Sequence, residues 1–416
     1  MFRRWRNRIL LFAAILGPGF ITANVDNDSG GILTYSQAGA QFGYNLLWMM
    51  IPITIALTVV QEMNARMGMV TGKGLSDLIR EEFGLRLTFV LMIVLVVVNF
   101  TNVVTEFIGI AGSLHLFHVT KFISVPICAA LVWAMVVKGN YKSTEKIFIV
   151  ASLVYITYIF AGVLSQPSWS QALRATLRPP EESAWRDKAY VYMAIGMVGT
   201  TIAPWMQFYL QSSIVEKGVQ SRNFFAMRLD VTVGSLFQDV VAWFIVVACA
   251  ATLYVHGMGA ISVAADAAEA MRPLAGDYAF ILFAFGLFNA SLFAASILPI
   301  STAYTVCEGL GFESGVDKSF REAPFFYWLY TLLIAGGGLV VLVLPDAQLI
   351  NFAILSQVLN GVLLPVIIIL MLLLINRSDL MGEFKNSRVW NLVAWSTSII
   401  VIAMTLIMLW GMIPGH

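Results

Sequence analysis

Charged residues are scarce in this chain of 416 residues. Only 12% of them are Asp, Glu, Lys or Arg, whereas soluble proteins average about 25%. Hydrophobic residues make up 59%, and the mean hydropathy is +0.81. This composition excludes a water-soluble fold. The formal net charge of +1 gives no global field that would attract nucleic acid or an acidic partner.

Cysteine and histidine are also rare. The cysteines lie far apart without a C-x-x-C spacing, which argues against a disulfide or a thiolate metal site; they are Cys128, Cys249 and Cys307. The histidines fall at the ends of apolar runs or at the terminus; they are His115, His118, His256 and His416. No histidine is therefore placed to relay protons inside a membrane near neutral pH.

Apolar runs of about 20 residues, long enough to cross a bilayer as helices, recur along the whole chain. They are apolar on all sides, whereas the strands of a membrane β-barrel alternate in polarity. We therefore predict an all-α polytopic membrane protein with eleven transmembrane helices. The predicted spans are about 8–40, 45–68, 87–117, 122–138, 147–165, 189–216, 230–255, 277–305, 325–344, 349–375 and 390–412.

The distribution of Lys and Arg predicts the orientation of these spans, because positive residues accumulate in cytoplasmic loops. Alternate loops, starting with the N-terminus, hold nineteen of the 25 basic residues. We therefore expect a multi-pass protein of the cell membrane, plasma or inner, with a cytoplasmic N-terminus and an extracytoplasmic C-terminus. The first apolar run lacks a small-residue cleavage motif, so we interpret it as a retained helix.

Two predicted spans contain helix-breaking residues. In the first span Asp28 is followed by a serine and two glycines, and in the sixth Pro204 follows Gly196 and Gly199. Interrupted helices at matching positions are typical of inverted-repeat transporters, in which unwound backbone near the midplane binds the cargo. This predicts a single domain with one five-helix repeat at about 8–165, a second, inverted one at about 189–375, and an additional helix at about 390–412. Gly and Pro are, however, also common in ordinary membrane helices.

Other polar side chains inside the spans are candidates for function, because ionisable groups are costly in a membrane. Glu106 and Asp239 are possible ion-path or proton-path residues. Glu62 and Asp230 have the simpler explanation that they pair with Arg66 and Arg228, which lie close by in the sequence. In the tenth span, Gln357 either holds helices together or reaches a substrate.

Several motifs carry a family resemblance. They include Gly17-Pro18-Gly19-Phe20, Thr105-Glu106-Phe107-Ile108-Gly109, Glu308-Gly309, and the stretches 37–44, 70–75 and 356–365. On these motifs, from about residue 14 to 385, the chain resembles the Nramp family of divalent metal-ion transporters. The resemblance implies a LeuT-like fold, in which the first and sixth helices are unwound at the midplane.

The resemblance also implies a metal site, and this chain departs from the family pattern there. Asp28 keeps the family's aspartate ligand, but Gly31 stands where the family has an asparagine and Ala203 where it has a methionine. Trp205 replaces a histidine implicated in proton transfer. By correspondence, the remaining ligands would be the backbone carbonyls of Val25 and Thr200 and the side chain of Gln357.

These departures look like those of the Nramp-related magnesium transporters. Mg²⁺ prefers oxygen ligands and gives up its waters reluctantly, whereas a thioether suits softer transition metals. The small residues Gly31 and Ala203 would then free volume for a partly hydrated ion beside Asp28. Val103 also replaces a family aspartate, and the ninth span has no arginine. The resemblance thus implies uptake of Mg²⁺, with Mn²⁺ as a second substrate, without proton coupling.

Other functions are less compatible with these residues. The closest alternative is a proton-coupled Mn²⁺/Fe²⁺ symporter that uses Glu106. A sodium-coupled transporter of organic solutes would place Asp28 where a carboxylate substrate binds, and a channel of the same fold would give flux that does not saturate. No catalytic constellation occurs in the spans, so we expect no enzyme, no cofactor, no protein partner and no nucleic-acid partner, only metal ions and the bilayer.

Overall fold

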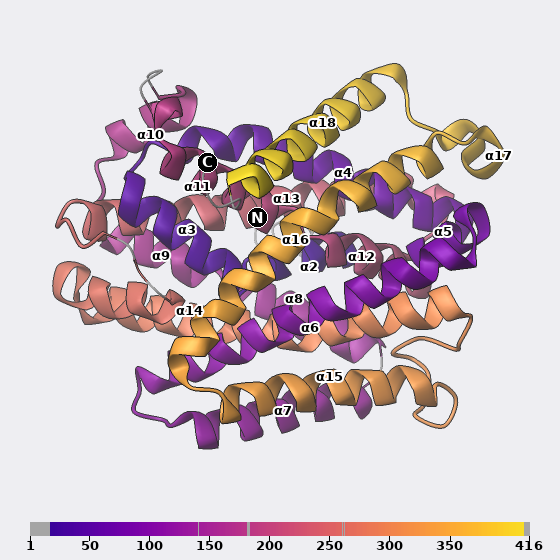
Figure 1. The fold of residues 1–416 in the computed structure, drawn as a ribbon, viewed down its shortest axis with the longest axis horizontal. Helices are drawn as coiled ribbons and strands as arrows, with labels where there is room; N and C mark the ends of the chain where they lie inside the picture. The colour runs from indigo at the N-terminus through magenta and orange to yellow at the C-terminus, as the bar shows by residue number, and fades with distance from the viewer. Residues whose placement is uncertain (1–16, 140, 181–183, 260, 262, 412–416) are drawn as a thin grey trace, which may run out of the picture.

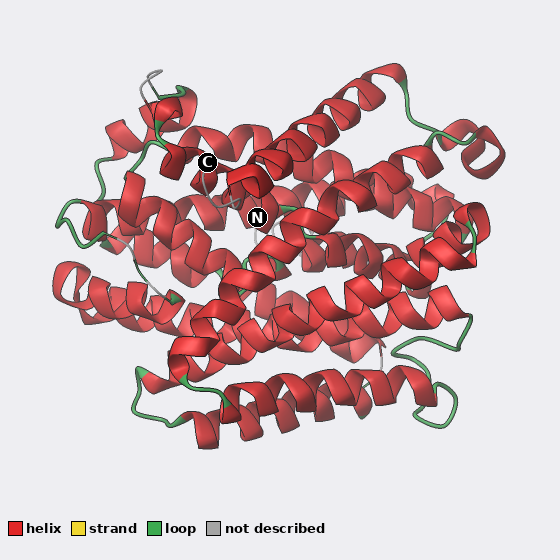
Figure 2. Cartoon of the chain, in the orientation of Figure 1, coloured by secondary structure: helices red, strands yellow, loops and turns green. Residues whose placement is uncertain are grey.

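The computed structural model describes residues 17–139, 141–180, 184–259, 261 and 263–411, and every regular element in these ranges is helical (Figure 2). The part of the first predicted span before residue 17, with its arginines, lies outside them. The α-helices are α2 (Pro18–Val25), α3 (Ser29–Phe42), α4 (Met50–Thr71), α5 (Leu75–Phe83), α6 (Leu85–His115), α7 (Lys121–Val137), α8 (Tyr141–Val154), α9 (Ile156–Leu164), α10 (Trp169–Leu177), α11 (Lys188–Thr201), α12 (Pro204–Glu216), α13 (Phe224–Cys249), α14 (Ala264–Leu310), α15 (Pro324–Val343), α16 (Asp346–Ile375), α17 (Ser378–Met381) and α18 (Arg388–Gly411).

The all-α prediction is confirmed for the described residues. Eight helical segments there are long and apolar enough to cross a membrane, and the shorter α7 is apolar as well. Two further predicted spans are pairs of shorter helices, α2 with α3 and α11 with α12. Their passage across a membrane, and so the count of eleven, stays a prediction. The three cysteines are free and buried.

The helices form one bundle (Figure 1). Inside it, α6 packs along α14, and α13 packs against α2, α3 and α4. At one edge α7 and α15 lie side by side (Figure 1), where the Tyr330 hydroxyl donates to the carbonyl of Val132 at 3.2 Å. At another edge α18 packs on α16 and α11. The interrupted helices α2, α3, α11 and α12 are thus enclosed by the longer ones.

The long α14 is two helices joined at a kink. Gly276 has φ +85° inside it, a conformation that glycine adopts without a steric penalty. The membrane-crossing candidate begins at Ala275, close to the predicted start at 277. The part of α14 before the kink is a separate helical segment that the apolar pattern did not predict.

Candidate functional site

The first interruption separates α2 from α3. Asp28 is the N-cap of α3, and its Oδ1 accepts a hydrogen bond from the Gly31 N–H at 2.7 Å. Aspartate stabilises this position because it satisfies an amide that has no partner within the helix. The side chain is 9% exposed. The sequence Asp-Ser-Gly-Gly therefore ends one helix and starts another, and its carboxylate stays at the break.

Two backbone carbonyls lose their helical partners at the breaks. The amide that would bond the carbonyl of Val25 in a continuous helix belongs to Ser29, and it donates instead to Glu106 Oε2 at 3.1 Å. The corresponding position for Thr200 is Pro204, which has no N–H. Both residues are buried. These are the two carbonyls that we predicted as metal ligands, and the local sequence explains why they are available.

The second interruption separates α11 from α12. Ile202 and Ala203 are non-helical, and Pro204 begins α12 at a position where its missing N–H costs little. The Ala203 N–H donates to the Met206 thioether at 3.3 Å. A sulfur atom therefore lies at this break, on Met206, one turn after Ala203. Its hydrogen bond turns it toward the backbone.

The two interruptions lie next to each other in the bundle. Helix α2 packs on α12, and α3 packs on α11. The Tyr35 hydroxyl of α3 and the Thr201 hydroxyl of α11 are 2.7 Å apart. Trp205 is buried at the start of α12, and its carbonyl accepts from the Ser301 hydroxyl of α14 at 3.0 Å. Ala203 is also buried, and its methyl group offers no ligand atom at that position.

Glu106 and Gln357 approach the first break from two neighbouring helices, α6 and α16. Glu106 of α6 is 1% exposed, and its Oε1 has no hydrogen-bond partner. Gln357 of α16 lies against Gly30, since a Cβ on that glycine would sit 3.2 Å from the glutamine Cδ and even closer to its amide nitrogen. A larger residue at position 30 would therefore displace the Gln357 amide. The structure brings Asp28, Gly31, Glu106 and Gln357 together.

The space beside Gly31 differs from the expectation. A Cβ on Gly31 would lie 2.5 Å from the backbone carbonyl of Asp26. The volume that an asparagine side chain would need is therefore filled by the chain itself. Gly31 contributes its N–H to the Asp28 carboxylate and leaves no open space for a hydrated ion at its own Cβ position.

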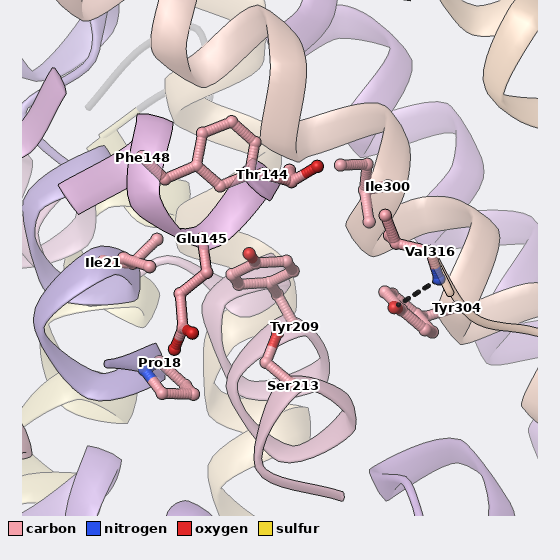
Figure 3. A pocket seen from close by; sticks show the side chains of 10 residues that line it. All are labelled: Pro18, Ile21, Thr144, Glu145, Phe148, Tyr209, Ser213, Ile300, Tyr304 and Val316. Carbon is pink, nitrogen blue, oxygen red and sulfur yellow. Dashed lines mark hydrogen bonds between the residues drawn. The ribbon is translucent and has the colours of Figure 1, made fainter. Parts of the chain in front are cut away.

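Access to the site is asymmetric. A cavity of about 670 Å³ lies between α3, α11, α16 and α18 and is lined by Thr34, Gln37, Gly199 and Gln357 among others. A second pocket, between α2, α8, α12 and α14, has about 10 Å³ of free volume, no more than a single water needs. Figure 3 shows Glu145 and Tyr209 among the side chains that line this small gap. The large cavity thus lies along the C-terminal part of α3, and the pocket at the start of α2 is nearly filled.

The closed end is held by a contact that the sequence did not predict. Asp230 of α13 accepts hydrogen bonds from the N–H groups of Gly17, Gly19 and Phe20 at 2.7, 2.8 and 3.1 Å. The expected pairing of Asp230 with Arg228 is therefore wrong. Carboxylates are favoured at helix N-termini because the unpaired N–H groups point at them.

Arg228 has a different partner, on α4. It pairs with Glu62 at 3.0 Å, and Arg66 pairs with the same carboxylate at 3.0 Å. The expected pairing of Glu62 with Arg66 is confirmed. Arg66 also donates to the carbonyl of Phe384 and to Asn386. This cluster joins α4 and α13 to the segment before α18.

Asp239 lies apart from the contacts around Asp28. It is buried on α13, and neither of its carboxylate oxygens receives a hydrogen bond. Sequence reasoning singled out Asp239 but missed Asp26, which interacts electrostatically with both Asp28 and Asp239. The sequence signal that could have identified Asp26 is its position two residues before Asp28, at the same helix break. Within the described residues, no group of three or more His, Cys, Asp or Glu side chains is arranged to hold a metal.

These features define a polytopic helical membrane protein in which two interrupted helices bring one carboxylate and free backbone carbonyls close to a glutamine that lines a cavity. Residues 19–411 match the family described as Natural resistance-associated macrophage protein-like, and the chain belongs to this Nramp family. Members of the family are transporters and not enzymes.

Individual relatives agree with this assignment. The "Divalent metal cation transporter MntH" of Aeromonas hydrophila is 27% identical over 409 residues, which cover 96% of each chain. The structure of the Eremococcus coleocola manganese transporter in complex with an aromatic bis-isothiourea substituted compound is similar with a TM-score of 0.76 and 22% identity, over 94% of this chain and 85% of the other. The nucleobase-cation-symport-1 family transporter Mhp1 has a TM-score of 0.59 and 13% identity, over 95% and 92% of the two chains. The last two show the fold alone.

Proposed function

We propose that this protein transports divalent cations, Mg²⁺ and also Mn²⁺, into the cell by alternating access and without proton coupling. The observation that carries the proposal is the ligand set at the breaks. Asp28 supplies one negative charge, and the carbonyls of Val25 and Thr200 lack helical partners. Oxygen ligands of this kind suit hard cations that keep part of their water. The names of the similar proteins support the divalent-cation class.

In this proposal the side chains around Asp28 have distinct roles. Gln357 lines the open cavity and lies against Gly30, so it would contact the ion directly or through a water. Gly31 positions the Asp28 carboxylate through its N–H. Ala203 provides no ligand atom, which removes the preference for soft metals that a thioether gives. Trp205 and Asp239 are proposed to line the ion path.

The proposed transport cycle follows from the asymmetric access. Eleven membrane spans, arranged as two inverted five-helix repeats (about 8–165 and 189–375) and a final helix (about 390–412), would place the breaks at the midplane and the N-terminus in the cytoplasm. The open cavity would then face outward, and the narrow end near Pro18 would face inward. Ions would enter on one side and leave on the other after a rearrangement of the interrupted helices.

The membrane potential is a sufficient driving force for this uptake. At 100 mV a divalent ion gains about 4.6 kcal/mol on entry, which corresponds to a concentration ratio of about 2000 at equilibrium. No second ion is needed for inward movement. A proton-coupled mechanism would therefore add nothing to the direction of transport.

A second candidate is a proton-coupled Mn²⁺/Fe²⁺ symporter. Two observations favour it: Glu106 bonds the Ser29 N–H directly beside Asp28, and the Met206 sulfur lies at the second break. Glu106 would accept the proton, and Met206 would supply the soft ligand after turning away from the Ala203 N–H. Strong transport of Cd²⁺, which favours sulfur, would support this candidate.

The experiment that tests the proposal is Mg²⁺ uptake into proteoliposomes, measured with a magnesium-sensitive dye. We expect saturable uptake that Asp28→Ala and Asp28→Asn both abolish. The asparagine variant keeps a good N-cap. A loss of uptake in this variant therefore results from the missing charge and not from damage to the start of α3. Asp187→Asn is the matched control, because Asp187 caps α11 in the same way but is exposed. Uptake that persists in Asp28→Asn would refute the proposal.

A further inference from the structure

A second group of buried oxygens lies beside the Asp28 contacts and has no role in them. It contains Asp26 at the α2–α3 break, with 1% exposure, and Asp239 on α13, with 4%. The two carboxylates interact electrostatically with each other, and both interact with the Tyr35 hydroxyl. Helix α13 packs against both α2 and α3, so the two carboxylates share one interior region.

Neither carboxyl group forms an ion pair with a Lys or Arg of the described residues. In the described part of the chain, the recorded ion pairs of Lys and Arg involve other acidic residues. Asp26 Oδ2 and both oxygens of Asp239 receive no hydrogen bond. The Thr54 hydroxyl lies near Asp239, but it donates its one hydrogen to the carbonyl of Met50 at 2.6 Å. An uncompensated buried carboxylate is costly, and two together are more so.

Amide groups around the two carboxylates use their nitrogens elsewhere and leave their oxygens unpartnered. Asn27 Nδ2 donates to the carbonyl of Gln238 at 3.1 Å, and Gln238 Nε2 donates to the Tyr35 hydroxyl at 3.3 Å. Both side chains are 0% exposed, and Asn27 Oδ1 and Gln238 Oε1 have no partner. These bonds join the residue after Asp26 to the residue before Asp239, and they place the Gln238 amide at the Tyr35 hydroxyl. The group therefore offers unpartnered oxygen acceptors, while each amide nitrogen has one of its two N–H groups bonded elsewhere.

We propose that Asp26 and Asp239, with the side-chain oxygens of Asn27 and Gln238, form a second cation site that binds a hard divalent cation. Two carboxylates balance the charge of one divalent ion, and amide oxygens complete a ligand set of the kind that Mg²⁺ and Ca²⁺ prefer. The inference rests on the proposed function only for the class of ion. The site differs from the Asp28 position because its second carboxylate comes from α13.

The test is Mn²⁺ binding to purified protein, followed by electron paramagnetic resonance with Mg²⁺ as competitor. It is done in the Asp28→Ala background, so that only the second site contributes. We expect Asp28→Ala to bind one Mn²⁺ per chain, which Mg²⁺ displaces. Adding Asp239→Asn should weaken this binding at least about tenfold, since affinity at such sites follows the number of charged ligands. Adding Asp26→Asn should do the same and provides the test if the first variant does not fold.

Thr232→Ala is the matched control on α13, because the Thr232 hydroxyl is already bonded to the carbonyl of Arg228 at 2.8 Å. It should leave Mn²⁺ binding unchanged. The inference is overturned if Asp28→Ala binds no Mn²⁺, or if folded Asp26→Asn and Asp239→Asn variants bind it as tightly as their parent. Failure of the proposed function is a separate result, because it appears as absent Mg²⁺ uptake by the unmodified protein.

Discussion

Asp230 is expected to hold the start of α2 in place. A substitution at Asp230 can weaken this contact without removing any of the proposed metal ligands. The 3% exposed carboxylate accepts three backbone N–H bonds of 2.7 to 3.1 Å. The helices also touch closely there, since a Cβ on Gly234 would lie 2.6 Å from the Cα of Phe20. Asp230→Asn keeps one acceptor oxygen but removes the charge and turns an NH₂ group toward backbone donors.

The magnitude follows from the strength of bonds to charged groups. Each such bond contributes about 1.5–3 kcal/mol. Removing the charge from the acceptor of the three bonds, as Asp230→Asn does, should therefore lower the local stability of the α2 start by about 2 kcal/mol. That corresponds to about a 30-fold increase in the open population of the α2 start. Hydrogen exchange measures such local opening directly. We expect the amides of Gly19 and Phe20 to exchange about 30-fold faster in Asp230→Asn.

The control and the refuting result use the same measurement. Asp187→Asn removes the charge of another helix-capping carboxylate, which accepts from the Ala189 N–H at 2.9 Å. It should change exchange at Ala189 only. Unchanged exchange at Gly19 and Phe20 in Asp230→Asn would mean that packing, and not this carboxylate, closes the inner end of the bundle.

Three further predictions concern the site and its supports. Ala203→Met adds a thioether at the second break, so Cd²⁺ should inhibit Mg²⁺ uptake more strongly; equal inhibition would contradict the assigned role of Ala203. Gly30→Ala pushes a Cβ into the Gln357 amide and should raise the KM for Mg²⁺, whereas Gly199→Ala, whose nearest new neighbour is 3.9 Å away, should not; equal KM values would remove Gln357 from the site. Arg66→Ala leaves a buried carboxylate with fewer partners and should destabilise the protein by about 3 kcal/mol, measured as a lower Tm; an unchanged Tm would mean that Arg228 alone balances the charge.

The helix breaks were predictable because their causes are local. An aspartate followed by serine and glycines favours a new helix N-terminus, and Pro204 cannot supply the amide that Thr200 would need. The same local chemistry identified Asp28 as a buried carboxylate at a break. The long apolar helices were predictable for the same reason, since each carries its own hydrophobic pattern.

Contacts between distant segments were not predictable in the same way. The partner of Asp230 is the start of α2, more than two hundred residues away, and nearby charge in the sequence suggested Arg228 instead. The space at Gly31 depends on where the Asp26 carbonyl turns after α2 ends. The grouping of Asp26 with Asp239 depends on the packing of α13 against the break. Each of these requires the tertiary arrangement.

The central claim, uncoupled transport of a hard divalent cation at Asp28, is tested most directly by recording Mg²⁺ and internal pH together. Proteoliposomes containing the unmodified protein would carry a magnesium-sensitive dye and a pH reporter, under a fixed membrane potential. The account predicts saturable Mg²⁺ entry with no acidification, lost in Asp28→Ala. Absence of Mg²⁺ entry together with Mn²⁺ uptake that acidifies the interior would contradict it, and would assign the coupling to Glu106.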